Sequence, residues 1–211
     1  MKLLYKTSRT LTIKLMDDSP YYSQNEYDIF INNLFYKKEK CNVFTIFDLK
    51  PNTSYQIKAG NSCQTFVTKN ESAFLDVKSF LSIGDGVTDD TIKIQAAIAC
   101  APKDATIYIS DGTYLVSSLF LKDDITVYIA KTAKIIAKTN RKDFPILPGL
   151  VDDYNFGVWE GAEETNFASV FNFINVENVS VVGDGEIDCR AKDSDWYINH
   201  RVKNIAYRGH A

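Results

Sequence analysis

The chain has 211 residues, of which 45% are hydrophobic and 13% aromatic, enough for one large domain or two smaller ones. Lys and Arg number 24 against 27 Asp and Glu, and the formal charge of -3 is spread without long runs of one sign. This composition lacks the basic footprint of a nucleic-acid-binding protein, and no apolar run is long enough to span a membrane. We therefore expect neither nucleic acid nor a membrane as a partner.

Short alternating segments separated by turn residues occupy residues 1–70. Apolar side chains recur at every second position, as in strands with one face on a core. The segments are TLTIKL (10–15), YDIFINN (27–33), VFTIFDL (43–49), SYQIKAG (54–60) and QTFVTK (64–69). The pattern predicts an antiparallel β-sandwich.

The stretch FDLKPNTSYQIKA places Leu49, Pro51 and Tyr55 at the start of one of these strands. This spacing predicts a tyrosine corner, in which the ring packs on the core and the hydroxyl bonds to the backbone upstream. With its length of about 70 residues, the segment resembles a fibronectin type III module. The usual early Trp is absent, so Ile13 or Leu15 would take its place.

A different pattern begins near Asn70 and runs to residue 211. After FLDVKSF (74–80) and a helix within 84–100, short strands recur at intervals of roughly twenty residues, with Gly, Asn and Asp at the corners. The expected strands are ATIYIS (105–110), GTYLVSSLFL (112–121), ITVYIAK (125–131), AKIIAKT (133–139), VFNFINV (170–176) and NVSVVGDGEIDC (178–189). The recurrence predicts a solenoid of parallel strands, with an ordinary sandwich as the alternative.

Two of these strands predict which side chains fill the interior of the coils. Ile125, Val127 and Ile129 alternate along one strand, and Val179 and Val181 along another. Alternate residues of a strand share a face, so we expect these five to point inward.

The stretch GDGVTDDTIKIQAAIAC (84–100) predicts a helix that covers the open end of the first coil. Thr88 is the expected N-cap, with Asp89 and Asp90 in the first turn, where carboxylates oppose the helix dipole. The expected apolar face comprises Ile92, Ile94, Ala96, Ala97, Ile98 and Ala99. A catalytic role for the two aspartates is the less favoured alternative, because adjacent helical residues point about 100° apart.

The four cysteines, Cys41, Cys63, Cys100 and Cys189, form no C-x-x-C pair, so we expect no zinc or other metal site and no cofactor. Cys41 and Cys63 can pair only if adjacent strands bring them together. The start MKLLYKTSRTLTIKL has too short an apolar run for a signal peptide. A cytoplasmic location is expected, with a secreted or periplasmic one as the alternative if a leader is missing.

Residues 75–149, with the phrase DFPILPG, and the later segments VVGDGEIDC and DSDWY carry a family resemblance. They resemble the polygalacturonase family of glycoside hydrolases, and the fibronectin-like module ahead of them resembles its bacterial exo-poly-α-galacturonosidase branch. Cys189 stands where that branch usually has Gly. The resemblance implies an all-β chain: a fibronectin III-like sandwich over 1–70, then the capping helix and first coils of a right-handed, pectin lyase-like parallel β-helix over 71–211.

The resemblance also implies an activity, the hydrolysis of α-1,4 bonds between galacturonic acid units with inversion. One aspartic acid protonates the leaving oxygen and two aspartates activate water, with acid and base about 6.5 to 9.5 Å apart. The family carries these groups in motifs N-T-D, D-D, G-H-G and R-I-K, after the VVGDGEIDC region. The sequence contains no N-T-D or R-I-K.

The acidic pairs and the terminal histidine of this chain do not replace those motifs. The pairs are Asp17–Asp18, Asp89–Asp90, Asp123–Asp124 and Asp152–Asp153, all ahead of the catalytic region, and we expect each to be a turn or cap. Gly209-His210-Ala211 arrives too early to be the family's G-H-G. We therefore expect an amino-terminal portion of an exo-polygalacturonase-like hydrolase, with no catalytic residue and no activity by itself.

Two aromatic segments are candidates for sugar contact, without assigned roles. Trp159 and Glu160 lie in a glycine-flanked stretch, where packing of the Trp is the commoner outcome. Trp196, Tyr197, His200, Arg201 and Lys203 form the second segment, whose basic groups match a galacturonate carboxylate.

The expected partner is a pectic polysaccharide or oligogalacturonate, together with self-association through an exposed end of the coils. Two alternatives stay open: a non-catalytic carbohydrate-binding or interaction module, and a fragment of a phage-type polysaccharide depolymerase.

Overall fold

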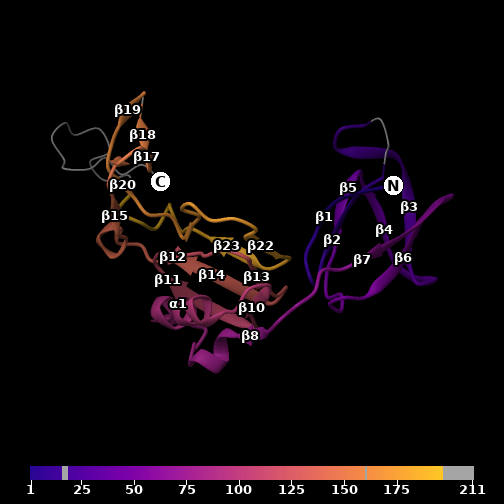
Figure 1. Ribbon diagram of the computed structural model, residues 1–211, viewed down its shortest axis with the longest axis horizontal. Helices are drawn as coiled ribbons and strands as arrows, with labels where there is room; N and C mark the ends of the chain where they lie inside the picture. Colours follow the sequence, from indigo (N-terminus) through magenta and orange to yellow (C-terminus); the bar gives the residue numbers. More distant parts are fainter. Residues whose placement is uncertain (16–18, 160, 197–211) are drawn as a thin grey trace. The chain divides into compact units, whose positions relative to one another are not determined.

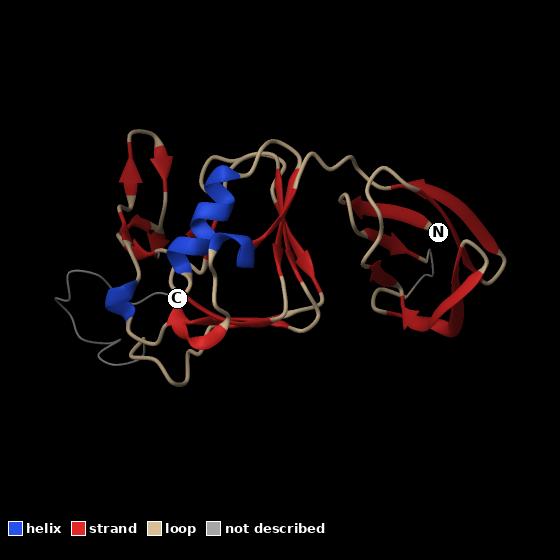
Figure 2. Cartoon of the chain, turned by 90° about the horizontal axis from the view of Figure 1, so that it is seen from below, coloured by secondary structure: helices blue, strands red, loops and turns tan. Residues whose placement is uncertain are grey.

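A computed structural model describes residues 1–15, 19–159 and 161–196, apart from the side chain of Trp159 (Figure 1). The chain divides into two compact units, Met1–Phe74 with Asp104–Thr106, and Leu75–Lys103 with the residues from Ile107 onward. Strands dominate both units (Figure 2), so the predicted all-β class is confirmed. No helix in the described ranges is long and apolar enough to cross a membrane.

The first unit contains two antiparallel sheets. One has the order β1-β2-β5, with β1 Lys2–Lys6, β2 Leu11–Lys14 and β5 Val43–Ile46. The other has the order β4-β3-β6-β7, with β3 Tyr22–Ile31, β4 Leu34–Cys41, β6 Ser54–Ala59 and β7 Ser62–Val67. Each predicted segment holds a strand. The edge strands β1 and β4 were missed, because they bury too little to show an alternating pattern.

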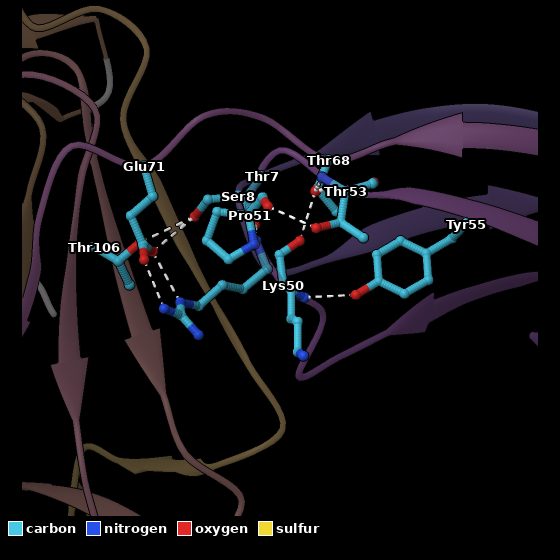
Figure 3. Close-up of polar contacts among 10 residues, drawn as sticks. Thr7, Ser8, Lys50, Pro51, Thr53, Tyr55, Thr68, Glu71 and Thr106 are labelled. Atoms are coloured by element: carbon cyan, nitrogen blue, oxygen red, sulfur yellow. Dashed lines mark hydrogen bonds and ion pairs between the residues drawn. The ribbon is translucent and has the colours of Figure 1, made fainter.

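Side chains from both sheets fill one core, which includes Leu11, Ile13, Ile29, Phe44, Ile46 and Ile57. The Tyr55 ring packs against this core, and its hydroxyl accepts a hydrogen bond from the backbone N–H of Lys50 at 2.7 Å (Figure 3). The predicted tyrosine corner is therefore confirmed. Ile13 is fully buried and Leu15 packs beside it, so both occupy the core. The fibronectin III assignment itself stays a prediction.

The segment that follows β7 is fixed to the first unit by a bidentate ion pair. Arg9 donates from Nε and Nη2 to the two Glu71 carboxylate oxygens at 2.8 and 2.6 Å, and the Ser8 hydroxyl donates at 3.2 Å. Partial burial raises the pKa of Glu71, but the bonds from Arg9 outweigh it, and the pKa lies below its usual value. The pair orders the chain beyond the last strand of the sandwich.

The alternative pairing of Cys41 with Cys63 does not occur. Cys41 lies on β4 and Cys63 on β7, at opposite edges of a four-stranded sheet, and all four cysteines are free. Two intervening strands separate these edges by roughly 14 Å. A disulfide requires Cα atoms within about 7 Å.

The second unit is built from stacked coils. Each turn of the chain adds one strand to each of two sheets, ordered β8-β10-β13-β22 and β9-β11-β14-β23, and the pairs of the second sheet are parallel. The bounds are β8 Phe74–Asp76, β9 Asp85–Asp89, β10 Ala105–Ile109, β11 Gly112–Val116, β13 Ile125–Ile129, β14 Ala133–Ala137, β22 Ser180–Gly183 and β23 Glu186–Asp188. A third pair, β12 Leu119–Phe120 and β21 Phe171–Asn172, is also parallel. The predicted solenoid is confirmed, and FLDVKSF splits into β8 and a 3₁₀ helix, Val77–Phe80.

The interior of the coils holds three of the five residues that were predicted to fill it. Ile125, Val127 and Ile129 are buried, as predicted. Val181 lies in register with Val127 on the next coil, but Val179 and Val181 are only half-buried. Val179 lies just before β22, and this strand is an edge of its sheet among the described residues, so one flank lacks a neighbour.

Two glycines of VVGDGEIDC allow successive coils to stack. A Cβ on Gly183 would collide with the carbonyl oxygen of Ile129, and one on Gly185 with that of Ala130. Gly183 also has a φ of 128°, which L side chains rarely adopt. The turn tolerates Cys189 because the left-handed residue is Arg190, with a φ of 49°.

The helix begins later than predicted. α1 spans Thr91–Cys100 with Asp90 as the N-cap residue, whereas Thr88 lies in β9 and donates its N–H and hydroxyl to the Asp85 carboxylate. The predicted Thr88 cap, and the placement of Asp89 and Asp90 in the first helical turn, are therefore wrong.

The buried stripe of α1 is also narrower than predicted. It consists of Ile94, Ala97 and Ile98, while Ile92 is 81% exposed. Ile92 lies about 200° around the helix from Ile94, so it faces solvent when Ile94 is buried. A short helix over one coil needs only a single apolar stripe.

The α1 side chains satisfy backbone groups of the next coil. Gln95 donates from Nε2 to the Phe120 carbonyl at 2.9 Å, and its Oε1 accepts from the Phe120 N–H at 2.8 Å. Thr91 Oγ1 accepts from the Ser117 N–H at 2.9 Å. The Gln95 amide thus forms the two bonds that a neighbouring strand would give to β12, and α1 takes the place of a strand in the first coil.

We predict that Gln95→Leu lowers the free energy of unfolding by about 1 to 3 kcal/mol, because it leaves both Phe120 backbone groups without partners. Urea unfolding followed by circular dichroism measures the change. Gln64→Leu, at an exposed position of the edge strand β7, is the matched control and should change stability by less than about 0.5 kcal/mol. Equal effects of the two variants would contradict the strand-replacing role of Gln95.

Candidate functional site on the coiled unit

Asp90 is a buried structural acceptor. Its side chain is 0% exposed, and its two oxygens accept the N–H groups of Ile83 and Gly84 at 2.8 Å each. Lys93, one turn into α1, forms an ion pair with it at 3.1 Å. The carboxylate therefore fixes the turn before the helix, and its lone pairs are occupied. This favours the structural interpretation of the acidic pair over the catalytic one.

Asp89 faces the opposite way, toward a lysine two coils on. Lys138 Nζ lies 2.6 Å from Oδ2, and Thr91 donates its N–H and hydroxyl to Oδ1 at 2.9 and 2.6 Å. Partial burial raises the pKa of Asp89, but the bonds from Lys138 and Thr91 outweigh it and lower the pKa. Asp89 is thus held as a carboxylate that ties the first coil to the third.

A second cluster of ion pairs lies on the same sheet. Lys134 on β14 contacts Glu186 at 2.7 Å and Asp188 at 3.3 Å, both on β23. The bond from Glu186, followed by that from Asp188, raises the pKa of Lys134. The backbone N–H of Arg190, followed by Lys134, lowers the pKa of Asp188. These cross-strand pairs staple neighbouring coils and leave Asp188 ionised.

The other described acidic pairs occupy turns, as predicted. Asp123 accepts the N–H of Glu177 at 2.7 Å, and Asp124, with a φ of 58°, accepts from the Asn178 amide at 2.9 Å. Asp152 and Asp153 form a hairpin turn. Asp17 and Asp18 lie outside the described residues.

Trp196 is packed rather than presented to solvent. Its side chain is 7% exposed, and its ring meets those of Phe144 and Phe167 edge-on, with centroids 5.2 and 4.9 Å apart. The packing outcome therefore holds for this residue. The remaining sequence candidates lie outside the described residues, namely Glu160, Tyr197, His200, Arg201, Lys203 and Gly209-His210-Ala211, together with the side chain of Trp159.

An excursion of the third coil, residues 138–170, is the feature that sequence reasoning missed. It leaves β14 and returns at β21, and it contains a 3₁₀ helix, Arg141–Asp143, and three antiparallel pairs (Figure 1). The pairs are β15 Ile146–Leu147 with β20 Asn166–Phe167, β16 Leu150–Val151 with β17 Tyr154–Asn155, and β18 Val158–Trp159 with β19 Ala162–Glu163. Two-residue strands are too short to show an alternating pattern.

Two adjoining hollows, of about 200 and 490 Å³, lie where this excursion meets the turn after β21. Both are lined by Tyr154, Phe156 and Ile174, and the rings of Tyr154 and Phe156 meet at 4.8 Å and 63°. The larger hollow also has Asp152 and Asp153 in its lining. We call this the Tyr154 groove.

The lining of the Tyr154 groove suits a neutral saccharide ring better than an anionic one. Aromatic faces give apolar contact, and the Asn155 and Asn166 amides of the smaller hollow give hydrogen-bonding groups. The residues of both linings include two carboxylates and no Lys or Arg. Within the described ranges, no group of three or more His, Cys, Asp or Glu can hold a metal ion.

Comparisons with known proteins agree with this architecture. Residues 74–142 match the family model described as "Rhamnogalacturonase A/epimerase, pectate lyase-like". The chain is 25% identical over 181 residues to an exo-poly-alpha-D-galacturonosidase of Dickeya chrysanthemi, covering 73% of this chain and 29% of that protein. It is 32% identical over 106 residues to the plasmin and fibronectin-binding protein A of Streptococcus pneumoniae, covering 46% of this chain and 15% of the relative.

Among solved structures, a family 28 exopolygalacturonase of Yersinia enterocolitica superposes with a TM-score of 0.62 at 21% identity, covering 88% of this chain and 39% of that chain. This likeness shows a shared fold. The chain thus spans less than two fifths of the length of each of these three proteins.

We predict that Asp90→Asn destabilises the second unit by about 1 to 3 kcal/mol, because a carboxamide offers one acceptor oxygen where two backbone N–H groups need one each. Thermal and urea unfolding of the full chain measure it. Asp184→Asn, at an exposed position, is the control and should leave stability nearly unchanged. A neutral Asp90→Asn variant would rule out the buried structural role.

We also predict that the stability difference between the parent chain and Lys138→Met depends on pH. The pKa of Asp89 is lowered in the folded state, so its stabilisation is complete above the unfolded value of about 3.9 and is lost as pH falls through the folded pKa. Urea unfolding should show a difference below about 1 kcal/mol at pH 6, which shrinks at pH 3. Lys142→Met, at an exposed position, should show no such trend. A constant difference for Lys138→Met would contradict the pairing.

Proposed function

We propose that this chain, which belongs to the polygalacturonase family of pectate lyase-like β-helix proteins, is the amino-terminal part of an exo-acting hydrolase of pectic polysaccharide. The observation that carries the proposal is the parallel coil stack, whose first turns match a pectate lyase-like family model over residues 74–142. Similarity to the Dickeya exo-poly-alpha-D-galacturonosidase across both units supports the exo-acting branch.

In this proposal residues 1–211 supply scaffold rather than the reacting carboxylates. The sequence lacks N-T-D, an acidic motif of the family's catalytic region, and R-I-K, a basic motif of the same region. Three carboxylates of the coils are already engaged in the fold. Asp90 is buried against backbone N–H groups, and Asp89 and Asp188 are paired with lysines. An inverting site needs two free carboxylates with room for water between them.

A second candidate is a non-catalytic binding module. The similarity to the pneumococcal plasmin and fibronectin-binding protein A favours it, since that match is 32% identical over 106 residues. Under this alternative the coils serve as a rigid display surface. The two candidates differ in partner, a pectic polysaccharide in the first and a protein in the second.

We predict that the purified chain migrates more slowly in native gels containing polygalacturonate than in plain gels, and releases no galacturonic acid from that polymer in a sensitive reducing-end assay. Dextran in the gel is the control for sieving. Release of galacturonic acid would show that the chain is itself active. Retention on immobilised plasmin or fibronectin, without any response to polygalacturonate, would favour the second candidate.

A further inference from the structure

The outer face of the sheet β4-β3-β6-β7 carries a row of aromatic and basic side chains. Phe30 on β3 lies directly opposite Phe35 on β4 and Lys58 on β6. Directly opposite residues of antiparallel strands project from the same face. Their strand neighbours Ile29 and Ile57 are fully buried in the core, so the row points away from it. We call Phe35, Phe30 and Lys58 the Phe30 row.

The groups of the Phe30 row contact one another and remain accessible. The Phe30 and Phe35 rings meet edge-on at 5.9 Å and 76°, and Phe35 is 58% exposed. Lys58 Nζ lies 5.9 Å from the centroid of the Phe30 ring. Among the described residues, the ion pairs of this sheet involve Lys37 and Lys38 rather than Lys58. The row therefore combines an apolar platform with an ammonium group beside it.

Formal charge is divided unequally along the chain. The first unit, residues 1–74 with 104–106, contains ten Lys and Arg against eight Asp and Glu, a net charge of +2, whereas the remaining residues contain fourteen against nineteen, a net charge of -5. A polyanion is attracted to the first unit and repelled by the second. The Tyr154 groove, with Asp152 and Asp153 in its lining, does not suit such a ligand.

We propose that the Phe30 row binds a segment of an anionic polysaccharide, with a sugar ring over Phe35 and Phe30 and a uronate carboxylate at Lys58. The choice of galacturonate as the sugar rests on the proposed function, while the need for an anionic polymer rests on the charge and geometry of this face. A uronate ring offers both groups that this face can bind: a sugar face for contact with the aromatic rings, and a carboxylate for the ammonium group.

Acidic groups limit where the polymer lies. Asp28, two residues before Phe30 on the same face, contacts Lys38 at 3.9 Å, and Glu26 contacts the same lysine at 3.5 Å. This part of the face therefore has two carboxylates for one ammonium. The bound segment extends across the strands toward Lys58 and away from Asp28. Neutralising Asp28 should strengthen binding, whereas changes in the row should weaken it.

The test is affinity electrophoresis of the full chain in gels containing polygalacturonate, alginate, fully methyl-esterified pectin or dextran. We expect Phe35→Ala and Lys58→Gln each to weaken binding to polygalacturonate roughly three- to tenfold. Asp28→Asn should tighten it about twofold, and the Lys58 effect should fade at high salt. Methyl-esterified pectin and dextran should bind weakly and respond little to Lys58→Gln.

Matched controls lie on the same unit outside this face. Lys50→Gln and Tyr21→Ala change an exposed lysine and an exposed aromatic residue and should leave binding unchanged. Unfolding curves of every variant show that the unit stays folded. Binding of polygalacturonate that ignores Phe35→Ala and Lys58→Gln, binding to neutral polymers as strong as to polygalacturonate, or binding to no anionic polymer would overturn the proposal. Binding of alginate but not polygalacturonate, still dependent on Phe35 and Lys58, would contradict the proposed pectic function and support the Phe30 row as a binding site.

Discussion

The second unit depends on the close stacking of parallel coils, in which each strand takes its backbone hydrogen bonds from the turns before and after it. The stacking leaves no room for a Cβ at Gly183 or Gly185 against the carbonyls of the preceding coil. It also places equivalent side chains in columns, such as Val127 beneath Val181. Charged side chains follow the same columns, so Lys134 meets Glu186 and Lys138 reaches Asp89.

Stacking of the coils leaves backbone hydrogen-bonding groups that α1 satisfies. The first coil has α1 in place of a strand beside β12, and an unpaired backbone edge that is covered by protein is costly. Gln95 supplies both a donor and an acceptor to Phe120, while Asp90 fixes the turn that precedes the helix. The conspicuous aspartates before the helix therefore serve the fold. The same demand for satisfied backbone explains why both Asp90 oxygens accept N–H groups, while Asp89 pairs with Lys138.

The two units differ in their charged and aromatic groups. The coils carry ion pairs of Lys134 and Lys138 with carboxylates of other strands, and a groove with two carboxylates in its lining. The sandwich carries the excess positive charge and an exposed aromatic row. Under the proposed function, this division would let the β-sandwich hold an anionic polysaccharide while the β-helix provides the rigid frame.

The sequence by itself determined the class of each unit, because alternation and recurrence are local properties that survive without tertiary context. It also predicted the Tyr55 corner and the inward positions of Ile125, Val127 and Ile129, since each depends on neighbours within one strand or turn. The tertiary structure decided the rest. α1 begins later than the sequence predicted, because the Asp90 carboxylate accepts hydrogen bonds from the N–H groups of Ile83 and Gly84. No helix-cap rule contains that contact. The excursion over 138–170 and the Phe30 row arise from pairing between distant segments. Strand register places Phe30 beside Lys58, and this register exists only once the sheet has formed.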